Sequence, residues 1–557
     1  MAQMNATDGV NDEPPVVIIG GGPVGLASAL ELAHHGIRSI ILERRKDVSM
    51  LRPRAKTVSP RTMELLRRWG IADRLRERAP LPVSWSKDVV FCTTVFGREV
   101  ARISDCFGLE LAGSDLVAEA GQQVAQPYVE QLFRDTVATS ELVNLVTGVV
   151  VLGVTEYEKA ALVEFENEGG TRSTVAAAYV LGCDGGGSTT RQAIGSTLQG
   201  GADSRPNLNV TFRAPELSDR ILHGPAIHYW VLNPDQPGIV GPLDLDGTWW
   251  GGGLGVDAET TTQTPEEIVQ NLLGEKFEIE VLSTDAWRAN MLLADKYASE
   301  RIFLVGDAAH QNPPWGGHGF NTGVGDAVNL CWKLAAVLNG WAPESLLATY
   351  EEERRPIEAL TIDISAKNMK VLSSELTDQR LFGDDEAFAD MAESVAAVIL
   401  SSKDAEFHSL GLTLGYDYEG SSIVATEPGR SDEFDDKIYT PTARPGHRLP
   451  HFWCGLGDSL FDHLGRGFSL VGDLSVTAAK SIIAAADQLG VPLCGVDLGA
   501  GRRRKDLFEA ALVLVRPDQH VAWRGDHTDN AIGLLQVAIG LNTDEQPRLR
   551  HTKGEHE

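Results

Sequence analysis

The chain of 557 residues is short of cysteine, and none of its cysteines are arranged in pairs. The six cysteines lie far apart, and no two of them form a CxxC motif. Scattered cysteines in a large chain are typical of a reducing compartment, so we expect a cytoplasmic protein. The pattern HExxH is also missing, and we expect no metal site. The first residues, MAQMNATDGVNDEPP, are acidic and lack the basic stretch with which a secretory signal begins.

Positive charge is scarce as well. Lys and Arg number 49 against 78 Asp and Glu, which gives a formal net charge of −29 at pH 7. A surface with this charge repels nucleic acid and anionic lipid, so we expect neither nucleic acid nor a membrane as a partner. Residues 16–33 are almost uncharged and about long enough to span a bilayer. The glycines and the proline in their first half favour a strand, a turn and a helix instead.

A glycine motif follows the first predicted strand. Residues 16–19 have the β-branched composition of a buried strand, and Gly20, Gly22 and Gly25 follow in the spacing GxGxxG before a helical pattern. Such glycines permit a tight turn, close approach of the backbone to a pyrophosphate, and helix–strand packing. Glu43 ends the second predicted strand, where a carboxylate can accept hydrogen bonds from ribose hydroxyls. The motif predicts an adenine dinucleotide, FAD or NAD, and the alternative is a turn that only packs.

A second motif lies at residues 301–332, which read RIFLVGDAAHQNPPWGGHGFNTGVGDAVNLCW. Asp307 ends a predicted strand, where its carboxylate can bond a ribityl or ribose hydroxyl. The backbone N–H groups of residues 316–325 could stabilise negative charge on a reduced isoalloxazine ring. The pattern GDAAHxxPP…GxGxN…DAxNLxWKL strongly resembles the GD motif of the flavoprotein aromatic hydroxylases, the single-component group with the p-hydroxybenzoate hydroxylase fold. The resemblance implies FAD as the cofactor, and His310 is expected to pack or cap within the motif.

Three further stretches resemble the same family. Residues 52–64 are similar to its PRA…RTxE segment, which would place Arg54 near the flavin. Gln126 begins a stretch like its flavin-contacting Gln motif, and residues 183–191 resemble its DG motif, which serves both FAD and the nicotinamide cofactor. Together these motifs predict the following cofactor-binding residues: Gly20, Gly22, Gly25, Glu43, Arg44, Arg54, Gln126, Asp184, Asp307, Gly317, Gly319, Phe320 and Asn321.

The resemblance also implies a reaction. NAD(P)H would reduce the bound FAD, the reduced flavin would react with O₂ to form a flavin hydroperoxide, and its terminal oxygen would hydroxylate a phenolic aromatic substrate. Pro313 and Pro314 are the candidates to hold the oxygen, by resemblance. A phenol ionises near pH ~10, so a base or a positive field is needed at neutral pH. The candidate bases are His228 and Tyr229, with His223 and Asp244, although a lone histidine is more often structural. Four tryptophans could wall a flat pocket, with ordinary sheet core as the alternative: Trp230, Trp249, Trp250 and Trp287.

Two other functions stay open at this point. One is a flavin-dependent Baeyer–Villiger oxygenase or epoxidase of the same fold, and the other is a non-catalytic flavoprotein or binding module. The partners expected are an aromatic small molecule, NAD(P)H and O₂, together with a second copy of the chain in a homodimer.

The fold class predicted is α/β. A Rossmann-type FAD-binding domain would carry an inserted antiparallel-sheet substrate domain and a C-terminal thioredoxin-like domain, as in the phenol, hydroxyphenylpropionate and aromatic polyketide hydroxylases. The C-terminal domain lacks a CxxC motif, which favours a structural or dimer-supporting role over a redox role. Pro356 is expected to bend or break its helix. The predicted segments are 14–85, 120–200 and 296–375 for the FAD-binding domain, 86–119 and 201–295 for the substrate domain, 376–430 for a connector, and 431–557 for the C-terminal domain.

Overall fold

A five-stranded parallel sheet forms the centre of the protein. The computed structural model describes residues 14–370, 376–429, 433–499 and 506–541. Strand β1 (Val16–Ile19) is fully buried because all four of its residues are apolar, and parallel strands covered on both faces have this composition. The sheet order is β17-β11-β1-β2-β7, and its other strands are β2 (Ser39–Glu43), β7 (Val143–Thr147), β11 (Val180–Gly182) and β17 (Ile302–Leu304).

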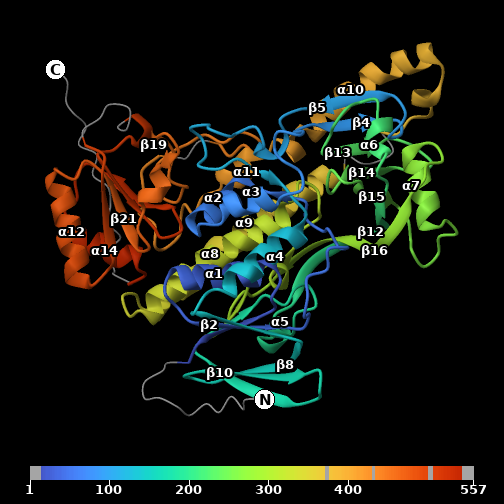
Figure 1. The fold of residues 1–557 in the computed structure, drawn as a ribbon. Helices are drawn as coiled ribbons and strands as arrows, with labels where there is room; N and C mark the ends of the chain where they lie inside the picture. Colours follow the sequence, from blue (N-terminus) through green and yellow to red (C-terminus); the bar gives the residue numbers. More distant parts are fainter. Residues whose placement is uncertain (1–13, 371–375, 430–432, 500–505, 542–557) are drawn as a thin grey trace, which may run out of the picture.

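Helices cover this sheet. Helix α1 (Pro23–His34) begins directly after Gly22 and packs against α8 (His318–Leu338) and α4 (Gln126–Val137). Figure 1 shows these helices side by side at the centre of the molecule. Residues 16–33, which are long and apolar enough to suggest a membrane span, thus form β1, a turn and most of α1. Every helix in the described part of the chain is too short or too polar to cross a bilayer.

Pro356 does not break helix α9 (Thr349–Lys370), and a bend at this residue stays a prediction. The helix continues through Pro356 as a single element. The residues around the proline are held by buried ion pairs, since Arg354 contacts Asp326 at 2.7 Å and Glu358 at 2.6 Å. Proline has no backbone N–H to donate to the helix. The ion pairs of Arg354 hold the helix on either side of this missing hydrogen bond, because Arg354 precedes Pro356 and Glu358 follows it.

Short elements complete this part of the fold. An antiparallel meander lies at one end of the molecule, at the bottom of Figure 1. Its strands are β8 (Val149–Glu156), β9 (Ala161–Asn167) and β10 (Arg172–Ala177). A two-stranded pair and three helices lie closer to the centre: β3 (Thr57–Val58), β6 (Gln122–Gln123), α2 (Pro60–Arg68), α3 (Ala72–Arg78) and α5 (Thr189–Ala193).

An eight-stranded sheet forms the second layer. Its order is β18-β16-β12-β15-β14-β13-β4-β5, and all neighbours are antiparallel except β13 and β4. The sheet is therefore largely antiparallel, as predicted. Its strands are β4 (Val89–Cys92), β5 (Glu99–Ile103), β12 (Leu198–Arg213), β13 (His228–Val231), β14 (Gly238–Pro242), β15 (Thr248–Leu254), β16 (Glu280–Ala294) and β18 (His310–Gln311). The helices α6 (Leu217–Arg220), α7 (Pro265–Leu273) and α10 (Asp385–Phe407) lie around it.

The C-terminal part contains a four-stranded sheet of order β22-β21-β23-β24. Strand β21 (Phe468–Gly472) runs parallel to β22 (Leu493–Asp497) and antiparallel to β23 (Leu512–Val515). This βαβ unit followed by a hairpin and a helix is the thioredoxin-like arrangement that was expected. Its remaining elements are α12 (Thr477–Leu489), β24 (Val521–Gly525) and α14 (Ala531–Ala538), with the hairpin of β19 (Trp453–Gly455) and β20 (Asp458–Ser459) nearby. Helix α11 (Leu410–Leu414) lies against α2 at the centre of the molecule. The domain boundaries stay predictions.

The C-terminal domain joins the FAD-binding part through a buried ionic contact, which we call the domain seam (Lys333, Glu353, Arg516 and Asp518). Arg516 makes two hydrogen bonds to Glu353, at 2.6 and 2.8 Å, and two to Asp518, at 2.6 and 3.1 Å. Lys333 also contacts Glu353, at 2.7 Å. Trp332 packs beside these groups in an apolar cluster that both parts share. The domain seam ties the two parts together in one chain.

Candidate active site

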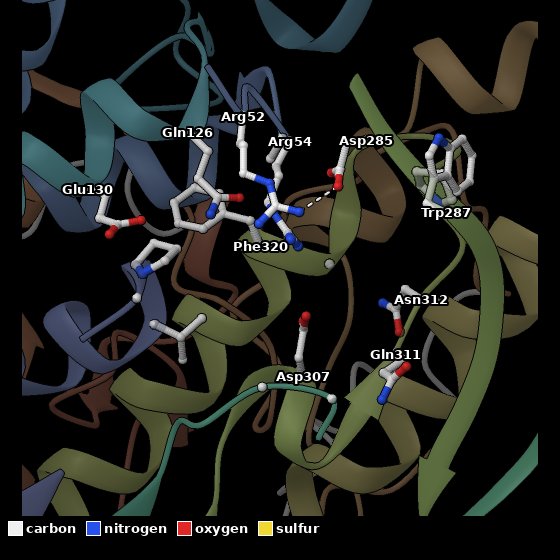
Figure 2. A pocket seen from close by; sticks show the side chains of 18 of the residues that line it. Arg52, Arg54, Gln126, Glu130, Asp285, Trp287, Asp307, Gln311, Asn312 and Phe320 are labelled. Carbon is white, nitrogen blue, oxygen red and sulfur yellow. Dashed lines mark hydrogen bonds and ion pairs between the residues drawn. The ribbon is translucent and has the colours of Figure 1, made fainter. Parts of the chain in front are cut away.

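One cavity of about 850 Å³ lies between the parallel sheet and the eight-stranded sheet. The carboxyl ends of β1, β2, β11 and β17 open into it, which is where α/β sheets bind their ligands. Figure 2 shows side chains from both layers converging on this space, with Asp307 facing Arg54 and Arg52. The volume is near the top of the range of roughly 300–1,000 Å³ for small-molecule sites, as a dinucleotide with a substrate requires.

The three motif glycines occupy distinct places at the cavity edge. Gly20 has φ +103°, and a Cβ there would lie 2.3 Å from the carbonyl oxygen of Cys183. Gly22 lines the cavity, and a Cβ would meet nothing within 4 Å, so this backbone is open to a ligand. Gly25 does not line the cavity. A Cβ on Gly25 would lie 1.9 Å from the carbonyl oxygen of Gly20, so Gly25 permits the helix to pack against the turn.

Glu43 is held at the end of β2 by two backbone donors. Its carboxylate accepts from Gly21 N at 2.6 Å and from Arg45 N at 2.8 Å. The Arg45 guanidinium also donates to Glu130, at 2.8 Å. Glu43 and Arg44 both line the cavity. Glu43 thus presents its remaining acceptor positions beside the glycine turn, where a ribose is expected.

The DG stretch (residues 183–191) and the GD motif (residues 301–332) contact each other in the fold. Arg191 in the DG stretch donates to the carbonyl oxygen of Ala308 at 3.0 Å and to that of Gly186 at 2.7 Å. Asp184 lines the cavity and accepts from Ser188 Oγ at 2.5 Å. Residues far apart in sequence therefore form a single edge of the cavity, as the motifs predict.

Asp307 is exposed to the cavity and enclosed by protein around it. Its carboxylate has no hydrogen bond among the described residues. Enclosure raises the pKa of Asp307, while the charges of His310 and Arg54 act in the opposite direction. A carboxylate in this state is suited to accept a hydroxyl hydrogen bond from a ligand.

The N-terminus of α8 forms the opposite edge. Gly316 has φ +89° and Gly317 has φ +68°, conformations that favour glycine. Gly317, Gly319 and Phe320 line the cavity, as do Arg54 and Gln126 from other elements. The first helical turn leaves backbone N–H groups without helical partners, and these groups can face an anionic ligand.

Asn321 does not line the main cavity, so its contact with the cofactor stays a prediction. Its amide oxygen accepts from Ser59 N at 2.9 Å and from Thr62 Oγ1 at 2.8 Å. Its amide nitrogen donates to the carbonyl oxygen of Thr57 at 3.2 Å. These bonds use both polar ends of the side chain. Asn321 therefore positions β3 and the start of α2 against α8.

Tyr229 also departs from its predicted place as a candidate base. His228 lines the cavity and Tyr229 does not, since successive residues of a strand point to opposite faces. The Tyr229 hydroxyl donates to the carbonyl oxygen of Gly224 at 2.7 Å and accepts from Ala226 N at 3.0 Å. Burial raises its pKa. Burial lowers the pKa of His228 to about 3, with the charge of Lys56 adding to the effect, so His228 is a weak base at neutral pH.

The remaining candidate bases lie outside the cavity. His223 faces Glu99 at 3.7 Å, and Asp244 accepts from the backbone of its own turn. His310 packs within the core, as expected, where it contacts Asp326 at 2.8 Å and Glu358 at 3.2 Å. Burial opposes its charge, but the two carboxylates outweigh burial and raise the pKa of His310 to about 9.

The sheet side of the cavity is an aromatic wall, which consists of Trp230, Trp250, Trp287 and Trp315. Their indole nitrogens are buried and find no hydrogen-bond partner in the described part of the chain. Trp249 points to the other face of the sheet and does not line the cavity. Pro313 and Pro314 lie next to Trp315 in the lining. Buried donors without partners are costly, so the aromatic wall is suited to a ligand that carries acceptors.

Sequence reasoning missed Trp315 and Lys56. Lys56 Nζ lies 3.8 Å from the ring centroid of Trp250 and donates to the carbonyl oxygen of Arg54 at 2.8 Å. Arg54 has φ +39°, a strained conformation for a residue with a side chain. The only sequence signal for Lys56 was its place between the PRA and RTxE segments.

These residues fit FAD. A Cβ built on Gly22 or Gly187 would meet no atom within 4 Å, so open space lies beside the backbone at both residues. Open backbone of this kind suits a pyrophosphate. Asp307 offers an acceptor without a protein partner, and Glu43 offers another at the expected ribose position. The fold and the site thus define a flavin-binding protein whose cofactor cleft continues into an aromatic pocket.

Comparisons with known proteins agree with this site. Residues 13–365 match the model of the FAD binding domain family, and residues 442–540 match that of the aromatic-ring hydroxylase C-terminal domain. The chain is 32% identical to the FAD-dependent monooxygenase apdD of Emericella nidulans, over 95% of this chain and 90% of that protein. It is 28% identical to the 2,4-dichlorophenol 6-monooxygenase of Delftia acidovorans, over 92% of this chain and 95% of that protein.

A solved structure shows the same architecture. Chromopyrrolic acid-soaked RebC with bound 7-carboxy-K252c superposes with a TM-score of 0.88 at 34% identity, covering 95% of this chain and 99% of that chain. The chain therefore belongs to the FAD-dependent aromatic hydroxylases, and FAD is its cofactor.

Proposed function

We propose that this protein uses NAD(P)H and O₂ to hydroxylate a phenolic aromatic compound. The observation that carries the proposal is the continuity of one cavity. Its FAD side, at the carboxyl ends of the parallel strands, runs without a break into the aromatic wall. Bound FAD supplies electron transfer from the nicotinamide and the activation of O₂.

The chain's own residues have three tasks in this reaction. Asp307, Glu43 and the glycine turns would bind the cofactor. The aromatic wall would orient a flat substrate through ring contacts and indole N–H donors, and it would exclude water from the reacting ring. Pro313 and Pro314 lie where the two regions meet, and their carbonyl groups can accept a hydrogen bond without a competing N–H from the same residue.

Two exposed cations support binding of an anionic nicotinamide cofactor. Arg44 and Arg52 both line the cavity, and they stand out on an otherwise acidic chain. We place the reaction in the cytoplasm, since none of the six cysteines forms a disulfide. A homodimer stays a prediction.

The experiment is a panel of phenols incubated with the FAD-loaded protein, with NAD(P)H oxidation and hydrogen peroxide both measured. We expect at least one phenol to accelerate NAD(P)H oxidation and to gain an oxygen atom from isotopic O₂. A yellow protein that oxidises no NAD(P)H with any phenol in stopped flow would indicate a non-catalytic flavoprotein. Insertion of the labelled oxygen into a ketone or an alkene, with no phenol hydroxylated, would contradict the proposal in favour of the Baeyer–Villiger or epoxidase function.

A further inference from the structure

Lys56 is fixed at the boundary between the cofactor side of the cavity and the aromatic wall. Its carbonyl oxygen accepts from Val124 N at 2.9 Å, and the next residue, Thr57, pairs with Gln123 in the β3–β6 ladder. Asn321 holds the carbonyl of Thr57 from α8. The backbone of Lys56 is thus held from two sides, so the amine projects into the cavity from a defined point.

The surroundings of the Lys56 amine leave it able to act on a ligand. It donates one hydrogen bond, to the Arg54 carbonyl oxygen, and it has no ion-pair partner among the described residues. An amine with one hydrogen bond donated keeps its lone pair for a proton. The face of Trp250, 3.8 Å from Nζ, stabilises the ammonium form once the proton has arrived.

The neighbouring charges support the same role. Burial lowers the pKa of Lys56 to about 7, which leaves a large neutral fraction at physiological pH. His228 also contacts Trp250, with ring centroids 5.5 Å apart, and His228 is neutral because burial, with the charge of Lys56 adding to it, lowers its pKa to about 3. Arg54 lies two residues before Lys56 in the chain and also lines the cavity. Among these groups, Lys56 is the one that can change its charge near neutral pH.

We propose that Lys56 takes the proton of the substrate's phenolic hydroxyl and holds the phenolate as an ion pair. The phenolic O–H bond breaks, an N–H bond forms at Nζ, the neutral amine becomes an ammonium, and no other reactant is needed. The phenolate ring is richer in electrons and reacts faster with an electrophilic oxygen. This inference rests on the proposed hydroxylation of a phenol.

The test uses 2-naphthol, a flat phenol whose ionised form absorbs at a longer wavelength than its neutral form. The FAD-loaded wild type, Lys56→Met, Lys56→Arg and the control Lys46→Met are titrated at about pH 8, below the pKa of ~10 typical of phenols. Lys46 is an exposed residue that pairs with Glu168 outside the cavity. We expect naphtholate in the wild type and in Lys46→Met, and at least a tenfold smaller naphtholate fraction in Lys56→Met. Flavin content and circular dichroism show that each variant is folded.

Proton counting separates proton uptake from a simple field effect. In the wild type the phenolic proton moves to Lys56, so binding releases almost no proton to the buffer. Arginine is always charged, so Lys56→Arg should bind naphtholate with release of about one proton per ligand. Equal naphtholate in the wild type and Lys56→Met would overturn the proposal, and so would release of a full proton by the wild type. No binding of any phenol by the wild type would instead overturn the proposed function and, with it, this inference.

Discussion

The aromatic wall and the domain seam are both buried and both polar, but they treat their polar groups in opposite ways. At the domain seam, Glu353 receives bonds from Arg516, Lys333 and Asn329, so its two oxygens are fully used. In the aromatic wall, four indole N–H groups have no partner in the described protein. Removing a paired buried charge damages folding, whereas removing an unpaired donor damages ligand binding. Trp249 also has an unpartnered indole N–H in the described protein but lies away from the cavity, so lack of a partner indicates a ligand contact only for a group that also lines the cavity.

The largest expected effect is at the domain seam. Glu353→Gln leaves Arg516 and Lys333 partly uncompensated. Burial opposes the charge of the Glu353 carboxylate, but the Arg516 guanidinium and the Lys333 ammonium outweigh burial and lower its pKa to about 2. We expect the free energy of unfolding to fall by about 3–5 kcal/mol in urea titrations. The matched control is Glu168→Gln, an exposed partner of Lys46, with a loss below about 1 kcal/mol. Equal losses of unfolding free energy in Glu353→Gln and Glu168→Gln would show that the buried pairing of Glu353 does not stabilise the fold.

The second effect concerns His310. It lies only three residues from Asp307, but its ring is paired with the carboxylates of Asp326 and Glu358. Its pKa in the folded protein is raised to about 9 from 6.5, mainly by Glu358 and Asp326 against the cost of burial. A raised pKa stabilises the fold fully below pH 6.5, and the contribution disappears as the pH rises through 9. We expect a loss of roughly 3 kcal/mol across this window, measured by urea midpoints. In His310→Gln the same slope should be absent, and an unchanged slope would contradict the assignment.

The third effect is at Asp307, which has no hydrogen-bond partner in the described part of the chain. Asp307→Asn should weaken FAD binding by about 1.5–3 kcal/mol, or roughly 10- to 150-fold, because a charge-assisted hydrogen bond is lost. The apoprotein should be as stable as the wild type or more so, since the enclosure that raises the pKa of Asp307 no longer acts on a charge. Fluorescence titration with FAD and urea unfolding of the apoprotein measure the two quantities. A destabilised apoprotein with unchanged FAD affinity would show that Asp307 stabilises the fold and does not bind FAD.

The smallest effect is in the aromatic wall. Trp287→Phe removes an indole N–H that has no partner among the described residues. It keeps an aromatic ring near Trp315, and the centroids of the two native rings lie 6.0 Å apart. We expect the affinity for a bound phenol to fall by about 0.5–1.5 kcal/mol, with no loss of stability. Trp249→Phe, on the far face of the sheet, is the control and should leave phenol affinity as it was. Equal changes in affinity for the two variants would show that the indole donors do not contact the ligand.

Much of the FAD side could be predicted from the chain because the signals are local. A turn with φ +103° at Gly20, a close approach at Gly25 and the start of a helix after Gly22 depend on neighbouring residues. Gly20, Gly22, Glu43 and Asp307 all reach the cavity edge for this reason. The substrate side was harder to predict, since the register of a strand sets which face of the sheet each of its side chains lies on. His228 and Tyr229 are neighbours in the chain, and only His228 lines the cavity.

The amino-acid sequence by itself determined the nucleotide motifs, the layered α/β fold and the family, because each depends on residue types at short spacing along the chain. Only the tertiary structure decided that Lys56 lies over Trp250, that Asn321 positions β3 rather than lining the cavity, and that Arg516 reaches Glu353. These contacts join segments that are distant in the chain. Their geometry follows from how the sheets and helices pack, which no local pattern encodes.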